Sequence, residues 1–336
     1  MKSSKDRRPT IYDVAEASGA SISTISRVYN SPELVNEATR TKVLETIERL
    51  GYVPKAEARA RALQSRCRVG VLTPFFIAPS FVQRLRGIDA ALAQTNHELV
   101  IYTVESLSRL QGYLLNLPLT GDLDGLIIMS LPYDEAAAGR LSQHGPETVS
   151  IEFSHPNFSS IEIDDAAGGE IAARYLVNKG HRRFGFIGDI DPPDYAINPA
   201  ISRLQGFHKG LAEANLSLPD EYIRSSHNDQ ELTQNAARWL LNLPEPPTAI
   251  FAAADIQAIA VLKAARALGL EVPKDLAIIG FDDLDLADYI GLTTIRQPLD
   301  DSGRIAAELL LSRLNNPSYP VQHVKLPLQV VERDTA

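Results

Sequence analysis

The chain has 336 residues, of which 44% are hydrophobic, and this length and composition are typical of a globular protein with two or three domains. No stretch approaches the about 18 uninterrupted apolar residues of a membrane span, and the basic N-terminal segment lacks the apolar core of a secretory signal. The single cysteine, Cys67, excludes an internal disulfide and a multi-cysteine metal site, so we expect a cytoplasmic protein without metal or cofactor.

The charge is unevenly divided along the chain. The net charge is −9, but residues 1–68 contain 13 Lys and Arg against 8 Asp and Glu, whereas the remainder contains 20 against 34. A basic N-terminal part followed by an acidic body is typical of a protein that binds a polyanion at one end. An ordinary solvated surface would give the same counts, so the charge alone does not decide between the two.

The first predicted elements are two short helices joined by a glycine turn. Thr10 and Asp13 have the spacing of a capping box, and Gly19 supplies the backbone freedom that ends the first helix. Ser21 is suited to cap the second helix, in which Val28 is expected to face the interior. This arrangement is typical of a helix-turn-helix, which places its second helix in the major groove of DNA.

The outward face of the second helix has side chains suited to contact DNA bases. Ile22, Ser23 and Arg27 are expected to face solvent, and arginine is the best partner for guanine in the major groove. A third helix is predicted over 37–50, with Asn36 as its N-cap. Side chains with hydrogen-bonding tips suited to phosphates are Tyr12, Asn36, Thr39 and Tyr52. A protein-docking module of three small helices is the alternative to DNA binding.

After an Ala- and Arg-rich linker over residues 55–68, short apolar strands alternate with helical stretches. Strands are predicted at 69–73, 99–103, 125–129, 148–151, 184–187, 249–252 and 276–279. Helices between them are predicted at 81–94, 168–179, 205–214 and 256–268. The alternation predicts parallel sheets with helices on both faces, which bind ligands at the carboxyl ends of their strands.

Motifs of common enzyme classes are missing from this body. The segment GFGFIGD lacks the third glycine of a dinucleotide-binding turn, and no phosphate-binding loop, HExxH zinc motif or GxSxG serine elbow occurs. The sequence therefore favours a binding protein over an enzyme.

The stretch from Thr10 to Pro54 resembles the headpiece of the LacI/GalR family of bacterial transcription regulators. The resemblance lies in the strings TIYDVAEASGASISTISRVYN and VNEATRTKVLETIERLGYVP. It implies that Ile22, Ser23 and Arg27 contact bases from the second helix. Contacts with the DNA backbone, or the positioning of such contacts, are implied for Thr10, Tyr12, Thr24, Asn30, Asn36, Thr39 and Tyr52.

The linker departs from the pattern of that family. There the segment forms a hinge helix that pairs with its twin on DNA and inserts a leucine into the minor groove. In this chain Arg61 occupies that position, Leu63 comes two residues later, and Lys55 replaces the usual asparagine. Because arginine is suited to a narrow minor groove, we expect Lys55 and Arg61 to contact DNA without a leucine wedge. A solvated linker that contacts only phosphates is the alternative.

The resemblance extends over nearly all of the remaining chain. The strings that support it include IDDAAGGEIAARYLVNKGHRRFGFIGD, RLQGFHKGL and PTAIFAAADIQAIAVLKAARALGLEVPKDLAIIGFDD. It implies an all-α helix-turn-helix headpiece (1–54), a hinge linker (55–68) and an α/β core (69–336) like periplasmic sugar-binding proteins. The core would consist of two Rossmann-like lobes, about 69–164 with 297–326 and about 165–296 with 327–336, joined by three crossings around a cleft.

The cleft of the resembled family binds a small effector. Arg203 and Asp282 match an arginine and a carboxylate that commonly bind the ligand, and Glu152 lies near a position that is usually aspartate. Effector contacts are also expected from Pro74, Phe75, Asp255 and Gln297. An arginine and carboxylates beside apolar walls suit a polyhydroxylated ligand.

Each of these polar residues has an alternative role. Arg203 would pair with a carboxylate at the rim, Asp282 would cap a turn, and Glu152 would be solvated. Asp255 would be the N-cap of the helix that follows it. Ala254 replaces an asparagine that usually contacts ligand, so the identity of the ligand stays open.

The sequence as a whole predicts a ligand-responsive transcription regulator, most simply a repressor. We expect it to bind double-stranded operator DNA as a homodimer and to respond to a small molecule, with carbohydrates as the leading class. No apolar heptad tail follows residues 328–331, which favours a dimer over a tail-linked tetramer. A cytosolic solute-binding protein and a sugar-modifying enzyme that use the same cleft are the alternatives.

Overall fold

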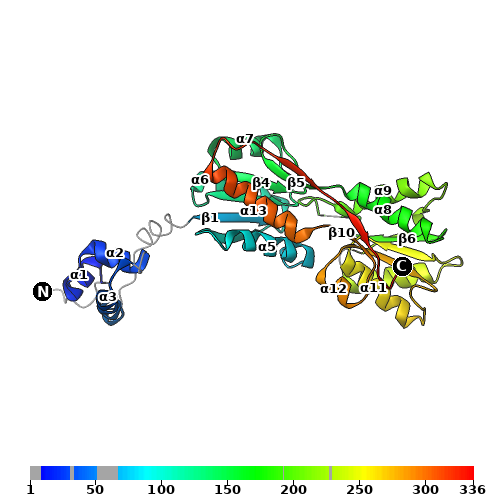
Figure 1. The fold of residues 1–336 in the computed structure, drawn as a ribbon, viewed down its shortest axis with the longest axis horizontal. Coiled ribbons are helices and arrows are strands. Elements are labelled where there is room, and N and C mark those ends of the chain that lie inside the picture. Colours follow the sequence, from blue (N-terminus) through cyan, green and yellow to red (C-terminus); the bar gives the residue numbers. More distant parts are fainter. Residues whose placement is uncertain (1–8, 31–33, 51–66, 192, 227–228) are drawn as a thin grey trace. The chain divides into compact units, whose positions relative to one another are not determined.

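The computed structural model describes residues 9–30, 34–50, 67–191, 193–226 and 229–336. The chain divides into two compact units, Met1–Cys67 and Arg68–Ala336. The first unit is named the headpiece below and the second the core (Figure 1).

The headpiece contains three helices around a small apolar centre. They are α1 (Ile11–Ser18), α2 (Ile22–Asn30) and α3 (Glu37–Leu50). Val14, Ile25, Val28 and Val43 are each at most 5% exposed and contact one another. The predicted helices and the inward position of Val28 are therefore confirmed.

The ends of α1 are held by local hydrogen bonds. The Asp13 carboxylate accepts hydrogen bonds from the backbone N–H and the hydroxyl of Thr10, each at 2.6 Å. Gly19 has φ +69°, and its N–H donates to the carbonyl of Ala15. The capping box and the glycine stop together fix where the turn before α2 begins.

The first lobe of the core contains a six-stranded sheet in the order β11-β5-β4-β3-β1-β2, with every neighbouring pair parallel. Its strands are β1 (Arg68–Thr73), β2 (Glu98–Thr103), β3 (Gly125–Met129), β4 (Glu147–Ile151), β5 (Ser159–Ile163) and β11 (His323–Leu326). Its helices are α5 (Pro79–Leu92), α6 (Leu107–Thr120), α7 (Glu135–His144) and α13 (Leu299–Asn315).

The second lobe has a sheet in the order β12-β10-β9-β8-β6-β7, in which only the pairing of β12 with β10 is antiparallel. Its strands are β6 (Phe184–Gly188), β7 (Ile223–Ser225), β8 (Ala249–Ala252), β9 (Ala277–Asp282), β10 (Thr294–Arg296) and β12 (Gln329–Val331). Its helices are α8 (Asp165–Asn178), α9 (Pro199–Glu213), α10 (Gln230–Leu241), α11 (Asp255–Ala267) and α12 (Asp285–Tyr289), with a 3₁₀ turn at Asp220–Tyr222.

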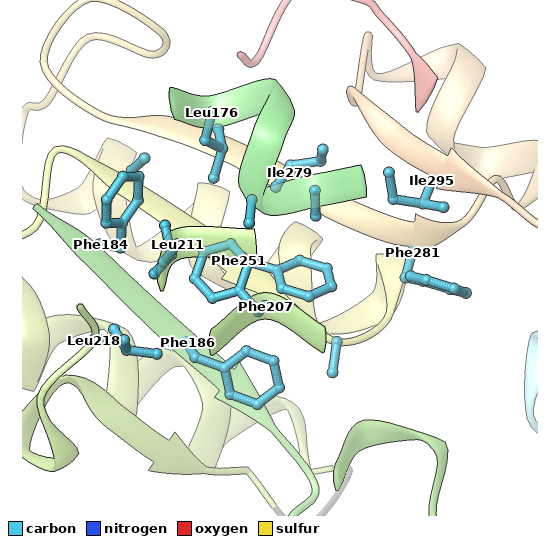
Figure 2. Packing of buried hydrophobic residues seen from close by; sticks show 14 of the residues in the cluster. Leu176, Phe184, Phe186, Phe207, Leu211, Leu218, Phe251, Ile279, Phe281 and Ile295 are labelled. Carbon is cyan, nitrogen blue, oxygen red and sulfur yellow. The ribbon is translucent and has the colours of Figure 1, made fainter. Parts of the chain in front are cut away.

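Helices cover both faces of each sheet. In β3, Ile127 contacts the cluster under α5 and α13, whereas its neighbour Ile128 contacts the cluster under α6 and α7. In the second lobe, Phe251 and Phe281 lie in the cluster under α8 and α9 (Figure 2). Strands buried on both faces are nearly continuous apolar runs, which is why the sequence shows them so clearly.

The lobes exchange chain segments at three places in the described core. The chain passes between lobes from β5 to α8, from β10 to α13 and from β11 to β12. The predicted fold class, a helical headpiece with an α/β core of two lobes, is confirmed.

The sequence underestimated the strands. The structure also has β5, β7, β10, β11 and β12, and β9 extends to Asp282 instead of ending at residue 279. Three of the missed strands have only three residues each, and β5 alternates polar and apolar residues as SSIEI. Such segments lack a continuous apolar run, so their pairing with neighbouring strands defines them.

Candidate functional site

The headpiece presents an exposed helix face at α2. The hydroxyl of Ser21 accepts the N–H of Thr24 at 3.1 Å and so caps the helix. Ile22 is 41% exposed, and Ser23 and Arg27 are exposed as well. The residues expected to face outward therefore share a solvent-facing surface that begins at the helix N-terminus.

The other predicted headpiece residues lie in different environments. Tyr12 is 69% exposed, and Thr24 is half-buried. Asn36 is exposed and caps α3, because its Oδ1 accepts the N–H of half-buried Thr39 at 2.8 Å. The Thr10 hydroxyl is engaged with Asp13 at the start of α1. The side chain of Asn30 and the whole of Tyr52, Lys55 and Arg61 lie outside the described residues.

The core contains an open cavity between its lobes, at the carboxyl ends of the parallel strands. Five of the seven residues predicted to bind an effector line it, namely Phe75, Glu152, Arg203, Asp282 and Gln297. These five come from both lobes and from the crossing before α13. The cavity also contains Arg84, a residue that the sequence did not single out.

Arg84 lies on α5 in the first lobe, where a close helix crossing positions it. A Cβ added at Gly303 of α13 would lie 1.9 Å from the carbonyl oxygen of Arg84, so only glycine permits this approach. The Arg84 side chain is 2% exposed and donates from Nη2 to the carboxylate of Glu152. The same carboxylate accepts the hydroxyl of Ser130. The lobe therefore brings a guanidinium, a carboxylate and a hydroxyl together at one edge of the cavity.

Arg203 lies on α9 in the second lobe and is held by several groups. Its Nε donates to Asp165 at 2.8 Å, and its Nη1 donates to the carbonyl of Ala253 at 2.5 Å. The guanidinium lies over the ring of Phe281, 3.6 Å from the centroid, and 3.8 Å from the Asp282 carboxylate. The alternative role considered for Arg203, pairing with a carboxylate, is present here, and its guanidinium still lines the cavity.

Gln297 links the two edges at the crossing between lobes. Its Oε1 accepts a hydrogen bond from Nη2 of Arg84 at 3.1 Å, while its Nε2 donates to Asp282 at 2.5 Å. A continuous polar network therefore runs from Glu152 in one lobe to Asp282 in the other. A molecule bound in the cavity would contact groups whose positions depend on both lobes.

Burial and neighbouring charges set the protonation of the cavity carboxylates. Burial raises the pKa of Asp165 to about 6 against the opposing charge of Arg203. Burial also raises the pKa of Asp282, with Arg203 again opposing it. Burial acts in the same direction on Glu152, but the charge of Arg84 and hydrogen bonds from Arg84 and Ser130 lower the pKa of Glu152 below its usual value. Glu152 is therefore the carboxylate most firmly ionised.

Three cavity residues other than glycine have left-handed backbone conformations. The φ angles are +56° at Ser130, +66° at Glu152 and +118° at Asp282. Such conformations cost about 1–3 kcal/mol each and are concentrated at binding and catalytic sites. Their occurrence at the strand ends supports the cavity as the functional site of the core.

Aromatic side chains form an apolar part of the cavity lining, and a third ring lies close to them. The rings of Phe75 and Phe81 lie 5.9 Å apart edge to face, and Tyr195 of the second lobe lies 6.5 Å from Phe75. The backbone N–H of Ile197 donates to the carbonyl of Ser130 at 3.1 Å. The loop between β6 and α9 therefore contacts the first lobe directly across the cavity.

Two predicted effector residues have other surroundings. Pro74 is buried and does not line the cavity. Asp255 is also buried, and it is the first residue of α11, with Ala254 as the N-cap, so the expected N-cap role of Asp255 is wrong. Its carboxylate accepts the N–H of Leu284 and the hydroxyl of Thr294 instead. The residue joins α11 to β10 beneath the cavity.

The sequence contains a signal that would have identified Arg84. The helix that follows the first strand of each lobe contains arginine followed by Leu-x-Gly, as RLRG at residues 84–87 and RLQG at residues 203–206. The family resemblance assigns a ligand-binding role to Arg203 but none to Arg84. Ser130 and Asp165 were missed because their relevance depends on which arginine they approach.

The described residues contain neither a cluster suited to a metal ion nor a membrane-spanning helix. No group of three or more His, Cys, Asp or Glu side chains there is arranged to hold a metal ion. In the part of the chain that the structure describes, no helix is long and apolar enough to cross a membrane.

Comparisons with known proteins give consistent matches over nearly the whole chain. Residues 10–55 match the family of bacterial regulatory proteins named lacI, and residues 173–336 match a periplasmic binding protein-like domain. The chain is 33% identical over 331 residues to the HTH-type transcriptional repressor PurR of Photorhabdus laumondii, covering 96% of each protein. It is 30% identical over 334 residues to the ribose operon repressor of Escherichia coli K12, covering 97% of this chain and 99% of the relative.

A solved structure resembles the chain to a similar extent. The crystal structure of the lac repressor dimer bound to operator and the anti-inducer ONPF has a TM-score of 0.74 and 26% identity. The match covers 98% of this chain and 99% of that one.

Proposed function

The chain belongs to the LacI family of bacterial regulatory proteins, and on this premise we propose that it is a sequence-specific transcriptional repressor whose affinity for operator DNA is set by a small molecule. The observation that supports this most directly is the presence in one chain of an exposed, capped helix and a polar cavity between two lobes. The first suits a DNA groove and the second suits a small ligand.

The proposed DNA contacts centre on α2. Arg27 donates to guanine in the major groove, and Ile22 and Ser23 contact neighbouring base edges. Thr10 and Asn36 act chiefly through the caps that fix the N-termini of α1 and α3, since those helix ends suit phosphates. Contacts to the DNA backbone are proposed for Tyr12, Thr24, Asn30, Thr39 and Tyr52, and hinge contacts for Lys55 and Arg61.

The proposed effector site is the cavity of the core, with direct contacts from Phe75, Glu152, Arg203, Asp282 and Gln297. A ligand that favours one arrangement of the lobes over another shifts the population of that arrangement. If the lobe arrangement also affects operator binding, the ligand changes the affinity for operator. By linkage, operator then changes the affinity for the ligand by the same factor. The geometry supports a polyhydroxylated ligand, and the direction of control is left to the experiment below.

The active form is proposed to be a homodimer that reads a two-fold operator. Several large apolar side chains on neighbouring elements of the core are exposed, including Ile77 (77%), Val82 (49%) and Tyr289 (83%). Val82 lies one turn before Arg86 on α5, and Arg86 pairs with Asp285 of α12 at 2.8 Å. Apolar residues of α5 and α12 therefore lie near one another, as a surface covered by a second copy would require.

In this proposal the cavity binds its ligand without converting it, and the protein acts in the cytoplasm, where its operator is found. A solute-binding protein or a sugar-modifying enzyme would use the same cavity without needing α2. The exposed face of α2 favours the regulator.

A fluorescence anisotropy experiment tests the proposal. Labelled DNA from upstream of the chain's own gene is titrated with the protein at several salt concentrations, with and without each member of a sugar panel. We expect a sequence-selective, salt-sensitive complex whose affinity changes with one sugar. Arg203→Ala should retain DNA binding and lose the sugar response. Absence of selective binding, or turnover of the sugar, would contradict the proposal.

A further inference from the structure

The two lobes repeat one arrangement of strands. Their sheets run β11-β5-β4-β3-β1-β2 and β12-β10-β9-β8-β6-β7. Aligning these orders pairs β1 with β6, β3 with β8, and β4 with β9. Positions at the carboxyl ends of these strands are therefore equivalent between the lobes, and all of them face the same cavity.

Arg84 and Arg203 occupy equivalent positions in this repeat. Each lies on the helix that follows the first strand of its lobe, α5 after β1 and α9 after β6, and each helix begins with proline. A Cβ at Gly303 would lie 1.9 Å from the Arg84 carbonyl oxygen, and one at Gly169 would lie 2.0 Å from that of Arg203. The same close crossing thus holds each arginine at the cavity.

A buried carboxylate lies beside each arginine at an equivalent position, although Arg203 donates its hydrogen bond to Asp165 and lies 3.8 Å from Asp282. Glu152 directly follows β4 and Asp282 ends β9, and both have positive φ. Arg84 Nη1 reaches the hydroxyl of Ser130, which follows β3, at 3.4 Å, whereas Arg203 Nη1 donates to the carbonyl of Ala253, which follows β8. Each lobe therefore offers the cavity one arginine with one buried carboxylate beside it.

We propose that Arg84 and Glu152 form a second ligand-binding pair, the counterpart of Arg203 and Asp282, and that the ligand is a neutral molecule with hydroxyl groups on two opposite edges. This inference rests on the proposed effector role of the cavity. A guanidinium donates hydrogen bonds and a carboxylate accepts them, so each pair matches adjacent hydroxyls that accept from one group and donate to the other.

Unused donors at the cavity support this assignment. Nε of Arg84 and Nδ2 of Asn198 are buried and have no hydrogen-bond partner among the described residues. Both residues line the cavity. Buried donors without acceptors are costly, and hydroxyl oxygens of a ligand would satisfy them.

The charges around the cavity argue against an anionic ligand. Arg84 and Arg203 are the only basic residues among the described residues that line the cavity. Arg84 is paired with Glu152, and Arg203 with Asp165, whose side chains are 5% and 12% exposed. Asp189 and Asp282 also line the cavity. A phosphate or carboxylate would therefore have to displace one of these carboxylates or lie beside it without a counter-charge.

The inference is tested by thermal shift and calorimetry on the full-length protein with chemically matched sugars. The neutral compounds are ribose, glucose, galactose and cellobiose. Their charged counterparts are ribose 5-phosphate, glucose 6-phosphate, glucuronate, galacturonate, cellobionate and glucosamine. We expect at least one neutral compound to stabilise the protein and to bind at least tenfold more tightly than its charged counterparts.

Two variants separate a ligand contact from a structural role. Arg84→Lys keeps the buried charge but loses the planar fork, and we expect its affinity for the neutral sugar to fall at least tenfold. Arg109→Lys, on the exposed surface of α6 in the same lobe, is the control and should bind as wild type does. Glu152→Gln leaves Arg84 without its counter-charge, so we expect this variant to gain affinity for an acidic counterpart. Glu105→Gln, at an exposed glutamate of that lobe, should not.

Tighter binding of a charged compound by wild type overturns the neutral ligand class, and unchanged binding by Arg84→Lys overturns the second pair. If no compound stabilises the protein, the inference is wrong, while operator binding by the same preparation decides separately whether the proposed function stands. The inference is also wrong if Glu152→Gln binds operator normally but gains no affinity for an acidic compound.

Discussion

The pKa of Asp165 gives a quantitative prediction for stability. Burial raises this pKa from 3.8 to about 6 in the folded protein. A group with a raised folded pKa stabilises the fold fully below its unfolded pKa, and this stabilisation is lost as the pH rises through the folded pKa. A shift of about 2 pKa units corresponds to about 3 kcal/mol, at 1.36 kcal/mol per unit. Asp165 should therefore cost the wild type about 3 kcal/mol of unfolding free energy between about pH 4 and pH 7.

Asp165→Asn removes this titration while keeping an oxygen that accepts from Arg203. Urea unfolding is followed through the fluorescence of Trp239, the single tryptophan, which lies on α10 in the same lobe. Because the variant also loses the charge of Asp165, its stability at one pH is uninformative, and the quantity to compare is the change with pH. The unfolding free energy of the variant, relative to wild type, should rise by about 3 kcal/mol between about pH 4 and pH 7.

Asp220→Asn, at an exposed aspartate of the same lobe, is the matched control and should leave the pH dependence unchanged. If Asp165→Asn retains the pH dependence of wild type, Asp165 has an ordinary pKa in the fold. The account of the cavity as a place where burial outweighs the attraction of Arg203 would then be refuted.

Three further substitutions test other parts of the structure. Gly303→Ala places a Cβ 1.9 Å from the carbonyl oxygen of Arg84, and urea unfolding should show a loss of about 1–3 kcal/mol from overpacking; an unchanged midpoint would mean that the helices separate freely. Arg27→Ala should weaken operator binding by about 1–3 kcal/mol in anisotropy titrations, whereas Arg49→Ala, on the exposed part of α3, should not, and equal losses would argue against base contact. Tyr195→Ala removes the aromatic contact across the cavity, so calorimetry should show ligand binding weaker by about 0.5–1.5 kcal/mol with operator binding retained.

The headpiece was predictable from the sequence almost residue by residue. Its helices are short and end at local signals, such as the Thr10 and Asp13 cap and the left-handed Gly19. Local hydrogen bonds and backbone preferences act within three or four residues, so the sequence displays them directly. The hinge residues Lys55 and Arg61, outside the described part of the chain, remain predictions.

The fold class of the core was predictable from the sequence, but the prediction of its strands was incomplete. Buried parallel strands such as β3 and β8 are visible as apolar runs, and both have the bounds that the sequence indicates. Strands β10 and β12 have three residues each, and their pairing across distant parts of the chain defines them. Local sequence patterns do not show which distant segments pair.

The cavity shows the same limit at the level of single residues. Arg203 and Asp282 were expected there, but the N-cap expected at Asp255 proved to be Ala254, because the Asp255 carboxylate finds Leu284 and Thr294 instead. Arg84 was overlooked because its likeness to Arg203, in RLRG and RLQG, does not show that it is buried against Glu152, 68 residues further along the chain.

The sequence by itself determined the helical headpiece, the alternation that builds the core and the chemical types of several cavity residues, because these follow from interactions between near neighbours. Only the tertiary structure decided that Arg84 of one lobe and Arg203 of the other line the same cavity, and that a buried carboxylate lies beside each of them. That pairing depends on two sheets with the same strand order meeting at their carboxyl ends, and on glycines that allow the helices beside each arginine to touch.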